Sequence, residues 1–185
     1  MQMTSYTESI MNELQRTVAR IDDQSVGLLA GRIVQADQIF VAGAGRSGLM
    51  MRAFAMRLMH IGLRAYVVGE TVTPGLTAQD LLIIGSGSGE TKSLAVMAEK
   101  AAKAGAPVAL ATIVPESTIG RLSEIVIRVP AATKETADGG ATTIQPMGSL
   151  FEQSLLLLFD ALILQLMDLT GNNTSTMFGR HANLE

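Results

Sequence analysis

The stretch FVAGAGRSG, residues 40–48, is the part of the sequence that decides the fold. It begins as an apolar strand and runs into Gly43, Gly45 and Gly48, a G-x-G-x-x-G pattern that opens a helical segment. Glycines here allow a tight turn and close approach of the backbone to a ligand. One candidate ligand is a dinucleotide, with Glu70 after the next strand as the ribose-binding acid. The other is a different anion, because any tight βα turn selects glycine.

From residue 38 onward, short apolar runs alternate with helical segments. Strands are predicted at 38–43, 64–69, 80–86, 107–113 and 124–130. Helices are predicted between them near 47–61, 90–104 and 117–123. Nearly continuous apolar strands are typical of a parallel sheet covered on both faces. We therefore predict an α/β fold, a five-stranded parallel doubly wound (flavodoxin-like) sheet flanked by helices, with ligands beyond the carboxyl ends of its strands.

The segments on either side of this core are also predicted to be helical. An N-terminal helical region spans 4–36, with a capping box at Ser5 and Glu8 and a break at the sequence IDDQS. The apolar segment 150–170 is interrupted by polar residues, so it is expected to be a buried helix rather than a membrane span. Apolar residues nearly all round it suggest that a partner subunit covers part of it. One domain of 1–185 is expected, with an α/β core at 38–170 and a tail at 171–185.

Composition narrows the class of protein. The chain of 185 residues has a formal net charge of −3, which argues against binding nucleic acid or an anionic membrane. It has no cysteine, which excludes disulfides, cysteine-ligated metals and a thiolate nucleophile. The N-terminal residues lack the pattern of a signal peptide, so a cytoplasmic location is expected.

A second glycine loop, GSGSGETKS at 85–93, follows the third predicted strand. Its four hydroxyl residues are Ser86, Ser88, Thr91 and Ser93. Together with inward-turned N–H groups and a helix N-terminus, they suit a compact phosphate monoester. Helix capping alone would explain one or two of the hydroxyls. The residue order is not that of a P-loop, so nucleotide hydrolysis is disfavoured and a small phosphate ester is favoured.

Few residues are candidates for acid–base chemistry. Glu152 follows Ser149 at capping-box spacing, but a carboxylate in the first turn of a buried helix could also act as a general base. His60 ends a predicted helix, where the dipole would explain it, and His181 lies in the tail. The aperiodic loop 130–148 lies directly before the predicted helix 150–170, and its length is typical of functional or mobile loops.

These motifs resemble the sugar isomerase (SIS) domain family. The likeness is carried by the GAGRS turn, the SGSGET loop and the glutamate that opens the helix after the fifth strand. More narrowly, FAMRLMHIG, VVGETVTP, QPMGSLFEQ and RHANLE are similar to segments of 6-phospho-3-hexuloisomerases, over essentially the whole chain.

The resemblance implies that D-arabino-3-hexulose 6-phosphate is isomerised to D-fructose 6-phosphate through a cis-enediol, in formaldehyde fixation by the ribulose monophosphate pathway. It implies no metal or organic cofactor, and a homotetramer with shared active sites. The resemblance also implies a role for individual positions. The residues that hold the phosphate would be Ser47, Ser86, Ser88 and Thr91, and those that line the sugar end would be Gly45 and Arg46. Glu152 would be the base, and His181 or His60 of a neighbouring subunit would move the hydroxyl protons. The alternatives are a non-catalytic sugar-phosphate sensor, since SIS domains also occur in regulators, and an isomerase of another sugar phosphate.

Overall fold

Five parallel strands form one sheet in the computed structural model, which describes residues 3–131 and 143–184. The strands are β1 (Ile39–Gly43), β2 (Ala65–Val67), β3 (Leu81–Gly85), β4 (Val108–Thr112) and β5 (Ile125–Arg128). Their order is β2-β1-β3-β4-β5, and every neighbouring pair is parallel. The flavodoxin-like, doubly wound prediction is therefore confirmed. All five residues of both β3 and β4 are buried, as expected for strands covered on both faces.

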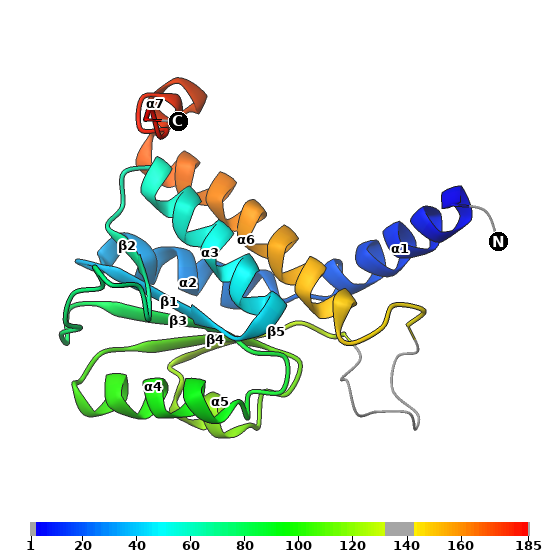
Figure 1. The fold of residues 1–185 in the computed structure, drawn as a ribbon, viewed down its shortest axis with the longest axis horizontal. Coiled ribbons are helices and arrows are strands. Elements are labelled where there is room, and N and C mark those ends of the chain that lie inside the picture. Colours follow the sequence, from blue (N-terminus) through cyan, green and yellow to red (C-terminus); the bar gives the residue numbers. More distant parts are fainter. Residues whose placement is uncertain (1–2, 132–142, 185) are drawn as a thin grey trace.

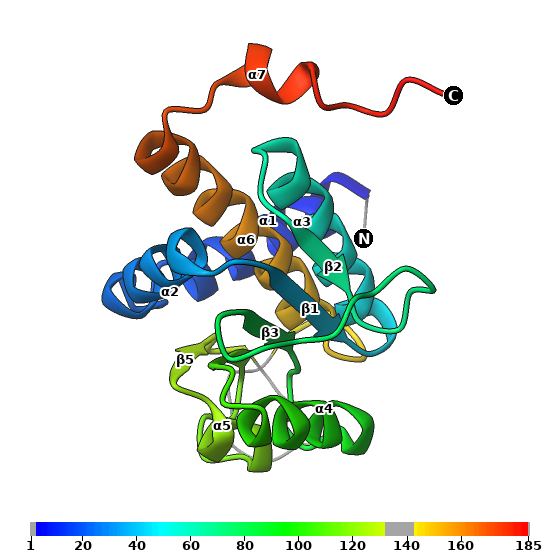
Figure 2. The same ribbon diagram turned by 90° about the vertical axis from the view of Figure 1, so that its left-hand side faces the viewer.

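Helices cover both faces of the sheet and give three layers (Figure 1 and Figure 2). The helices are α1 (Met3–Val18), α2 (Asp23–Gln35), α3 (Gly45–His60), α4 (Lys92–Lys103), α5 (Thr118–Leu122), α6 (Ser149–Thr170) and α7 (Thr174–Phe178). The larger apolar core lies between the sheet and α2, α3 and α6, and the smaller one lies between the sheet and α4 and α5. Figure 1 shows α1 packed by its C-terminal part against this body, with its N-terminal end extending away from it.

The turn from β1 into α3 requires glycine at two positions where the backbone segments are in direct contact. A Cβ on Gly48 would lie 2.6 Å from the carbonyl oxygen of Gly43, which is inside van der Waals contact. A Cβ on Gly43 would in turn lie 2.9 Å from the Cα of Gly48. The strand end and the first turn of α3 therefore pack backbone against backbone, which explains the spacing of the motif.

Helices α3 and α6 run side by side in the same direction. The rings of Phe54 and Phe159 stack between them with centroids 4.1 Å apart, and both side chains are almost fully buried. Their first turns are also joined, by an ion pair between Arg46 and Glu152. Helix α6 is long and apolar enough to cross a membrane by length and composition, but 56% of that window is buried inside the chain. It is thus a core helix, as predicted.

Two local predictions for the N-terminal region have different outcomes. The capping box at Ser5 is wrong, because α1 already begins at Met3 and the Ser5 carbonyl accepts a hydrogen bond from the Ser9 hydroxyl within the helix. The break at IDDQS is confirmed, since Asp22 caps α2 by accepting from the backbone N–H of Ser25 at 2.9 Å.

Two features of the C-terminal half complete the description. Of the predicted loop 130–148, residues 132–142 lie outside the described residues. In the tail, the short helix α7 was not predicted, and it begins with a capping box between Asn173 and Thr176.

Replacing Gly48 with Ala should destabilise the protein by about 2 kcal/mol or more, because the new methyl group meets backbone atoms that cannot move aside. Gly31→Ala is the matched control, since Gly31 lies within α2 and its added Cβ would have nothing within 4 Å. That change should instead stabilise the protein by about 0.5–1 kcal/mol. Urea denaturation of both variants tests this, and equal midpoints would contradict the close packing of the turn.

Candidate active site

The two glycine loops leave the sheet next to each other at its carboxyl edge. Gly43 at the end of β1 is the register partner of Gly85 at the end of β3. Strand β1 lies between β2 and β3, so the chain turns in opposite directions after β1 and after β3. This is the switch point at which open α/β sheets bind their ligands. The loops 44–47 and 86–91 therefore border one site.

The first loop leaves the N-terminus of α3 without a side-chain cap. The N-cap is Ala44, which makes no side-chain cap bond, and Gly45 follows it in a left-handed conformation with φ of 56°. Ser47 is half-buried in the first turn. Backbone N–H groups in a first helical turn have no partner within the helix, so a ligand oxygen can accept from them.

The second loop gathers hydroxyls ahead of α4. The hydroxyl of Ser86 is buried, accepts from the backbone N–H of Gly89 at 3.2 Å and lies 3.4 Å from the hydroxyl of Thr91. Ser88 is exposed, and its hydroxyl accepts from the backbone N–H of Glu90 at 3.2 Å. Thr91 is the N-cap residue of α4 but makes no side-chain cap bond. Helix capping therefore does not account for the Thr91 hydroxyl.

Residues from β4 and α5 hold the second loop in place. The Thr112 hydroxyl and the Ile113 backbone N–H both donate to the carbonyl oxygen of Gly87, at 3.1 and 3.0 Å. Gly89 has a φ of 63°, and a Cβ on it would lie 1.9 Å from the Ser117 hydroxyl oxygen. These supports could not be predicted from the sequence, because each partner lies more than twenty residues beyond the loop in the chain.

Glu152 is a buried carboxylate at the start of α6, beside both loops. One of its oxygens, Oε2, lies 3.0 Å from Nη1 of Arg46 in the first turn of α3, and the Glu152 side chain is only 7% exposed. The preceding ring, Phe151, would lie 3.4 Å from a Cβ on Gly87 in the second loop. The α6 N-terminus and the Arg46 guanidinium together compensate the burial of this negative charge.

The alternative interpretation of Glu152 as part of a capping box is wrong. The N-cap of α6 is Gly148, with a φ of 82°, and no side chain caps the helix. Ser149 is already inside the helix, and its hydroxyl donates to the carbonyl oxygen of Pro146 at 2.7 Å. The carboxylate is thus directed to Arg46 rather than to its own backbone.

The two candidate histidines lie together, but at the other end of α3. The rings of His60 and His181 stack with centroids 5.4 Å apart, and Arg57 Nη1 lies 3.3 Å from His60 Nδ1. Burial, followed by the positive charge of Arg57 and of His181, lowers the pKa of His60. A helix rises about 1.5 Å per residue, which puts His60 roughly 20 Å from Arg46. Within one protomer the histidines are therefore not brought to Glu152.

Glu70, the candidate acid for binding the ribose of a dinucleotide, contacts another residue of the chain instead. Glu70 forms an ion pair with Arg52 of α3, so its charge is already compensated. Among the residues that the structure describes, no group of three or more His, Cys, Asp or Glu could hold a metal ion.

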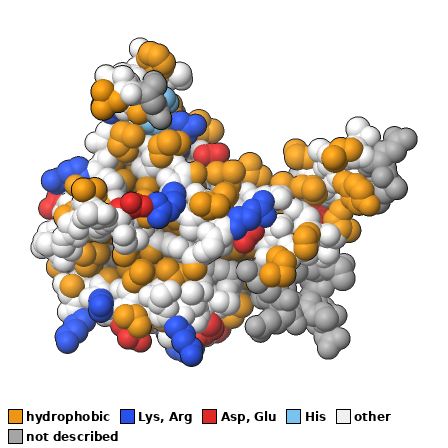
Figure 3. All heavy atoms as spheres, in the orientation of Figure 1, with side chains coloured by type: hydrophobic (Ala, Val, Ile, Leu, Met, Phe, Trp, Pro, Cys, Tyr) orange, Lys and Arg blue, Asp and Glu red, His pale blue; other side chains and the backbone are white. Residues whose placement is uncertain are grey.

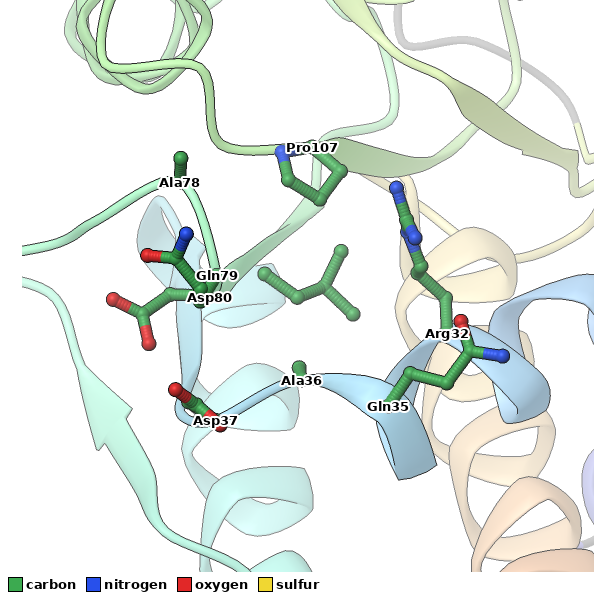
Figure 4. Close-up of a pocket in the computed structure, with 9 residues that line it drawn as sticks. Arg32, Gln35, Ala36, Asp37, Ala78, Gln79, Asp80 and Pro107 are labelled. Carbon is green, nitrogen blue, oxygen red and sulfur yellow. The ribbon is translucent and has the colours of Figure 1, made fainter.

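A cavity of about 320 Å³ lies at the opposite, amino edge of the sheet (Figure 4). Its buried carboxylate, Asp80, accepts from the backbone N–H and the hydroxyl of Thr77 and from the amide of Gln38. Asp80 therefore stabilises the turn that leads into β3. This cavity is separate from the carboxyl-edge site, and its acid has a structural role.

Comparison with known proteins places the chain in a family. A model of the SIS domain family matches residues 32–157. The chain is 54% identical to the 3-hexulose-6-phosphate isomerase of Bacillus subtilis over 185 residues, 100% of both chains. It is 44% identical to that of Mycobacterium gastri over 183 residues, 99% of this chain and 92% of the relative. A solved structure from Methanococcus jannaschii, a hypothetical protein with an inferred 3-hexulose-6-phosphate isomerase function, has a TM-score of 0.84 and 31% identity, covering 98% of this chain and 99% of that one.

The support of the second loop predicts a pH effect. Glu90 accepts from the backbone N–H of Thr118 at 2.7 Å, and this bond, the Thr118 hydroxyl and Arg121 hold the pKa of Glu90 below its usual range. A depressed pKa stabilises the fold above the unfolded-state pKa, and that stability is lost as the pH falls through the folded-state pKa. From about pH 5 to about pH 3, Glu90→Gln should therefore lose less unfolding free energy than the wild type. Denaturation at several pH values checks this. Glu99→Gln, on the exposed face of α4, is the control and should follow the wild type; equal losses in all three proteins would rule out the Glu90 contact.

Proposed function

The chain belongs to the SIS domain family and is a sugar-phosphate isomerase, and from that premise we propose that it converts D-arabino-3-hexulose 6-phosphate into D-fructose 6-phosphate. The observation that carries the proposal is the 54% identity to the Bacillus subtilis enzyme along the whole chain. We further propose that the reaction belongs to formaldehyde fixation by the ribulose monophosphate pathway, takes place in the cytoplasm and needs no metal or organic cofactor. Residues 1–185 would then form a single catalytic domain.

The phosphate of the substrate is proposed to bind between the two glycine loops. Ser86 and Thr91 already lie with their hydroxyl oxygens 3.4 Å apart, and Ser47 and Ser88 flank them at the same edge of the sheet. The helices α3 and α4 begin here, so their N-termini add positive potential and N–H donors. A phosphate anchored in this way would orient the sugar toward Glu152, which supplies part of the rate enhancement.

Glu152 is proposed as the base that moves the proton between carbons. It would take the proton from C2 while the electrons of that bond form the C2–C3 double bond and the oxygen on C3 gains a proton. This gives a cis-enediol. The oxygen on C2 then loses its proton to become the new carbonyl, and C3 receives a proton from the same carboxyl group. One carboxylate can perform both carbon steps if it lies over one face of the enediol.

Arg46 is proposed to have two parts in this reaction. In the structure it balances the charge of the buried Glu152 carboxylate, while 46% of its own side chain is exposed. When the sugar enters, the same guanidinium can donate to the oxygen that becomes negative as the enediolate forms. Gly45 is proposed to allow close approach of the sugar, since its added Cβ would have nothing within 4 Å.

A second copy of the chain is proposed to complete the site. Hydrophobic side chains lie along the surface of α6 and α1 in Figure 3, and Met11, Leu157 and Leu164 are 60%, 43% and 63% exposed. A subunit packed on this surface would bury them. We propose that His181, or His60 beside it, reaches the active site of a neighbouring subunit in a homotetramer and moves the hydroxyl protons. Burial, followed by the charges of Arg57 and His181, lowers the pKa of His60, whereas His181 is exposed and is the more accessible of the two to a neighbouring subunit.

A panel assay tests the activity directly. The purified protein, without added metal or nucleotide, should form fructose 6-phosphate from D-arabino-3-hexulose 6-phosphate at least about a hundredfold faster than it isomerises arabinose or other ketose phosphates, because differential transition-state binding sets substrate choice. Tight sugar-phosphate binding without turnover would instead support a non-catalytic sensor. Preference for another sugar phosphate would overturn the proposed substrate.

Replacing Glu152 with Gln should lower kcat about a thousandfold with little change in KM, since a general acid–base group contributes roughly 10²–10⁴ in rate. Glu99→Gln, an exposed acid on α4 across the sheet from α6, serves as the control and should keep wild-type kinetics. Near-normal turnover of Glu152→Gln would show that the base is another group.

The histidine assignment is tested by mixing subunits. His181→Asn and Glu152→Gln should each lower turnover strongly when present in all subunits. If the histidine acts across a subunit boundary, co-refolded mixtures of the two inactive variants should regain part of the activity, because some sites then combine an intact glutamate with an intact histidine. The formation of mixed oligomers is verified by mass. If they recover no activity, either both groups act in the same subunit or His181 takes no part in the reaction. The same experiment with His60→Asn distinguishes the two histidines.

A further inference from the structure

Glu13 is a buried carboxylate that the proposed reaction does not use. It lies in α1 and is 7% exposed. The Thr143 hydroxyl and the Gln145 side-chain amide donate to its Oε2 at 2.6 and 2.9 Å, and the backbone N–H of Ile144 donates to its Oε1 at 2.9 Å. Three donors from three consecutive residues, 130 or more positions away along the chain, thus converge on one side chain.

This contact is built for an ionised carboxylate. Burial raises the pKa of Glu13, but the hydrogen bonds from Thr143, Gln145 and Ile144 and the charge of Arg16 outweigh it and lower the pKa overall. A desolvated charge is tolerated only when it is hydrogen-bonded in this way. Because the donors all come from one segment, the effect of the contact is to hold that segment against α1.

The segment held by Glu13 leads into a strained turn. Residues 143–145 are followed by Pro146, by Met147 with a φ of 58° and by Gly148 with a φ of 82°. A left-handed conformation costs a residue with a side chain about 1–2 kcal/mol. Such a conformation persists only where its surroundings hold it in place. Helix α6 provides one fixed end of the turn, and the Glu13 contact provides the other.

The turn determines where Glu152 lies. The backbone N–H of Glu152 donates to the carbonyl oxygen of Gly148 at 3.1 Å, so the first turn of α6 is built directly on the second left-handed residue. No side chain caps this helix end. Any change in the direction of the chain at Met147 would therefore shift the start of α6, where Glu152 meets Arg46.

We propose that Glu13 is a positioning residue for Glu152. By accepting hydrogen bonds from residues 143–145, it fixes the turn at Met147–Gly148 and thereby the position of the first turn of α6. The inference rests on the proposed function and deepens it. Among the described residues, no hydrogen bond joins the phosphate loops after β1 and β3 to residues 143–145. Loss of Glu13 should therefore affect the chemical step more than substrate binding.

Kinetics of Glu13 variants provide the first test. Glu13→Ala should lower kcat about 10- to 100-fold, as expected for a displacement of the base by roughly 1 Å, while KM changes less than about threefold. Glu13→Gln, which keeps an oxygen to accept from Ile144, should recover part of the loss. Glu8→Ala, at an exposed position of the same helix, should leave both constants unchanged. Wild-type kcat in Glu13→Ala would overturn the proposal.

Hydrogen–deuterium exchange provides a second test that does not depend on activity. The amides of Ile144 and of 148–152 should exchange at least about tenfold faster in Glu13→Ala than in the wild type or in Glu8→Ala, since local opening governs exchange. If the wild type turns over no sugar phosphate, the proposed function fails, and this exchange result alone decides whether Glu13 holds the segment. Unchanged exchange would contradict the role of Glu13 in either case. Should Glu13→Ala not fold, Glu13→Gln carries both measurements.

Discussion

A buried carboxylate that needs a partner determines the arrangement of the site. Glu152 is almost completely removed from water, and the Arg46 guanidinium 3.0 Å away is the positive group that makes its ionised form tolerable. Arg46 stands in the first turn of α3 and Glu152 in the first turn of α6, so the pair requires both helices to begin at the same edge of the sheet. The parallel course of α3 and α6, with Phe54 stacked on Phe159 midway along them, follows from the same requirement.

The glycine positions serve this arrangement in different ways. Gly43 and Gly48 allow α3 to start in backbone contact with β1, which brings Arg46 to the edge. Gly85 ends β3 beside Gly43 and faces Met51 and Leu155, so the second loop, α3 and α6 meet without a gap. The site therefore lies where the backbone at Gly43, Gly48 and Gly85 is in close contact with its neighbours, and each of these contacts depends on the absence of a side chain.

The sequence predicts most of this fold, for physical reasons that are local. Apolar runs of strand length, separated by helical periods, require a parallel sheet, and glycine loops after the first and third strands must then share one edge. The position of Glu152 after Ser149, by contrast, suggested a capping box, and spacing could not distinguish a cap from a partner on another helix. The contacts of Glu13 with 143–145 and of Glu90 with Thr118 join distant segments, and no periodicity encodes them. The roles of the site residues in binding and catalysis remain predictions.

Proton NMR of fructose 6-phosphate incubated with the protein in deuterium oxide tests the central claim most directly. If Glu152 moves a proton between C2 and C3, the wild-type protein should replace the hydrogen on C3 with deuterium, and Glu152→Gln should do so about a thousandfold more slowly. Exchange at C1 instead of C3 would indicate an aldose-forming isomerase. Equal exchange at C3 in both proteins would contradict the assignment of Glu152 as the base.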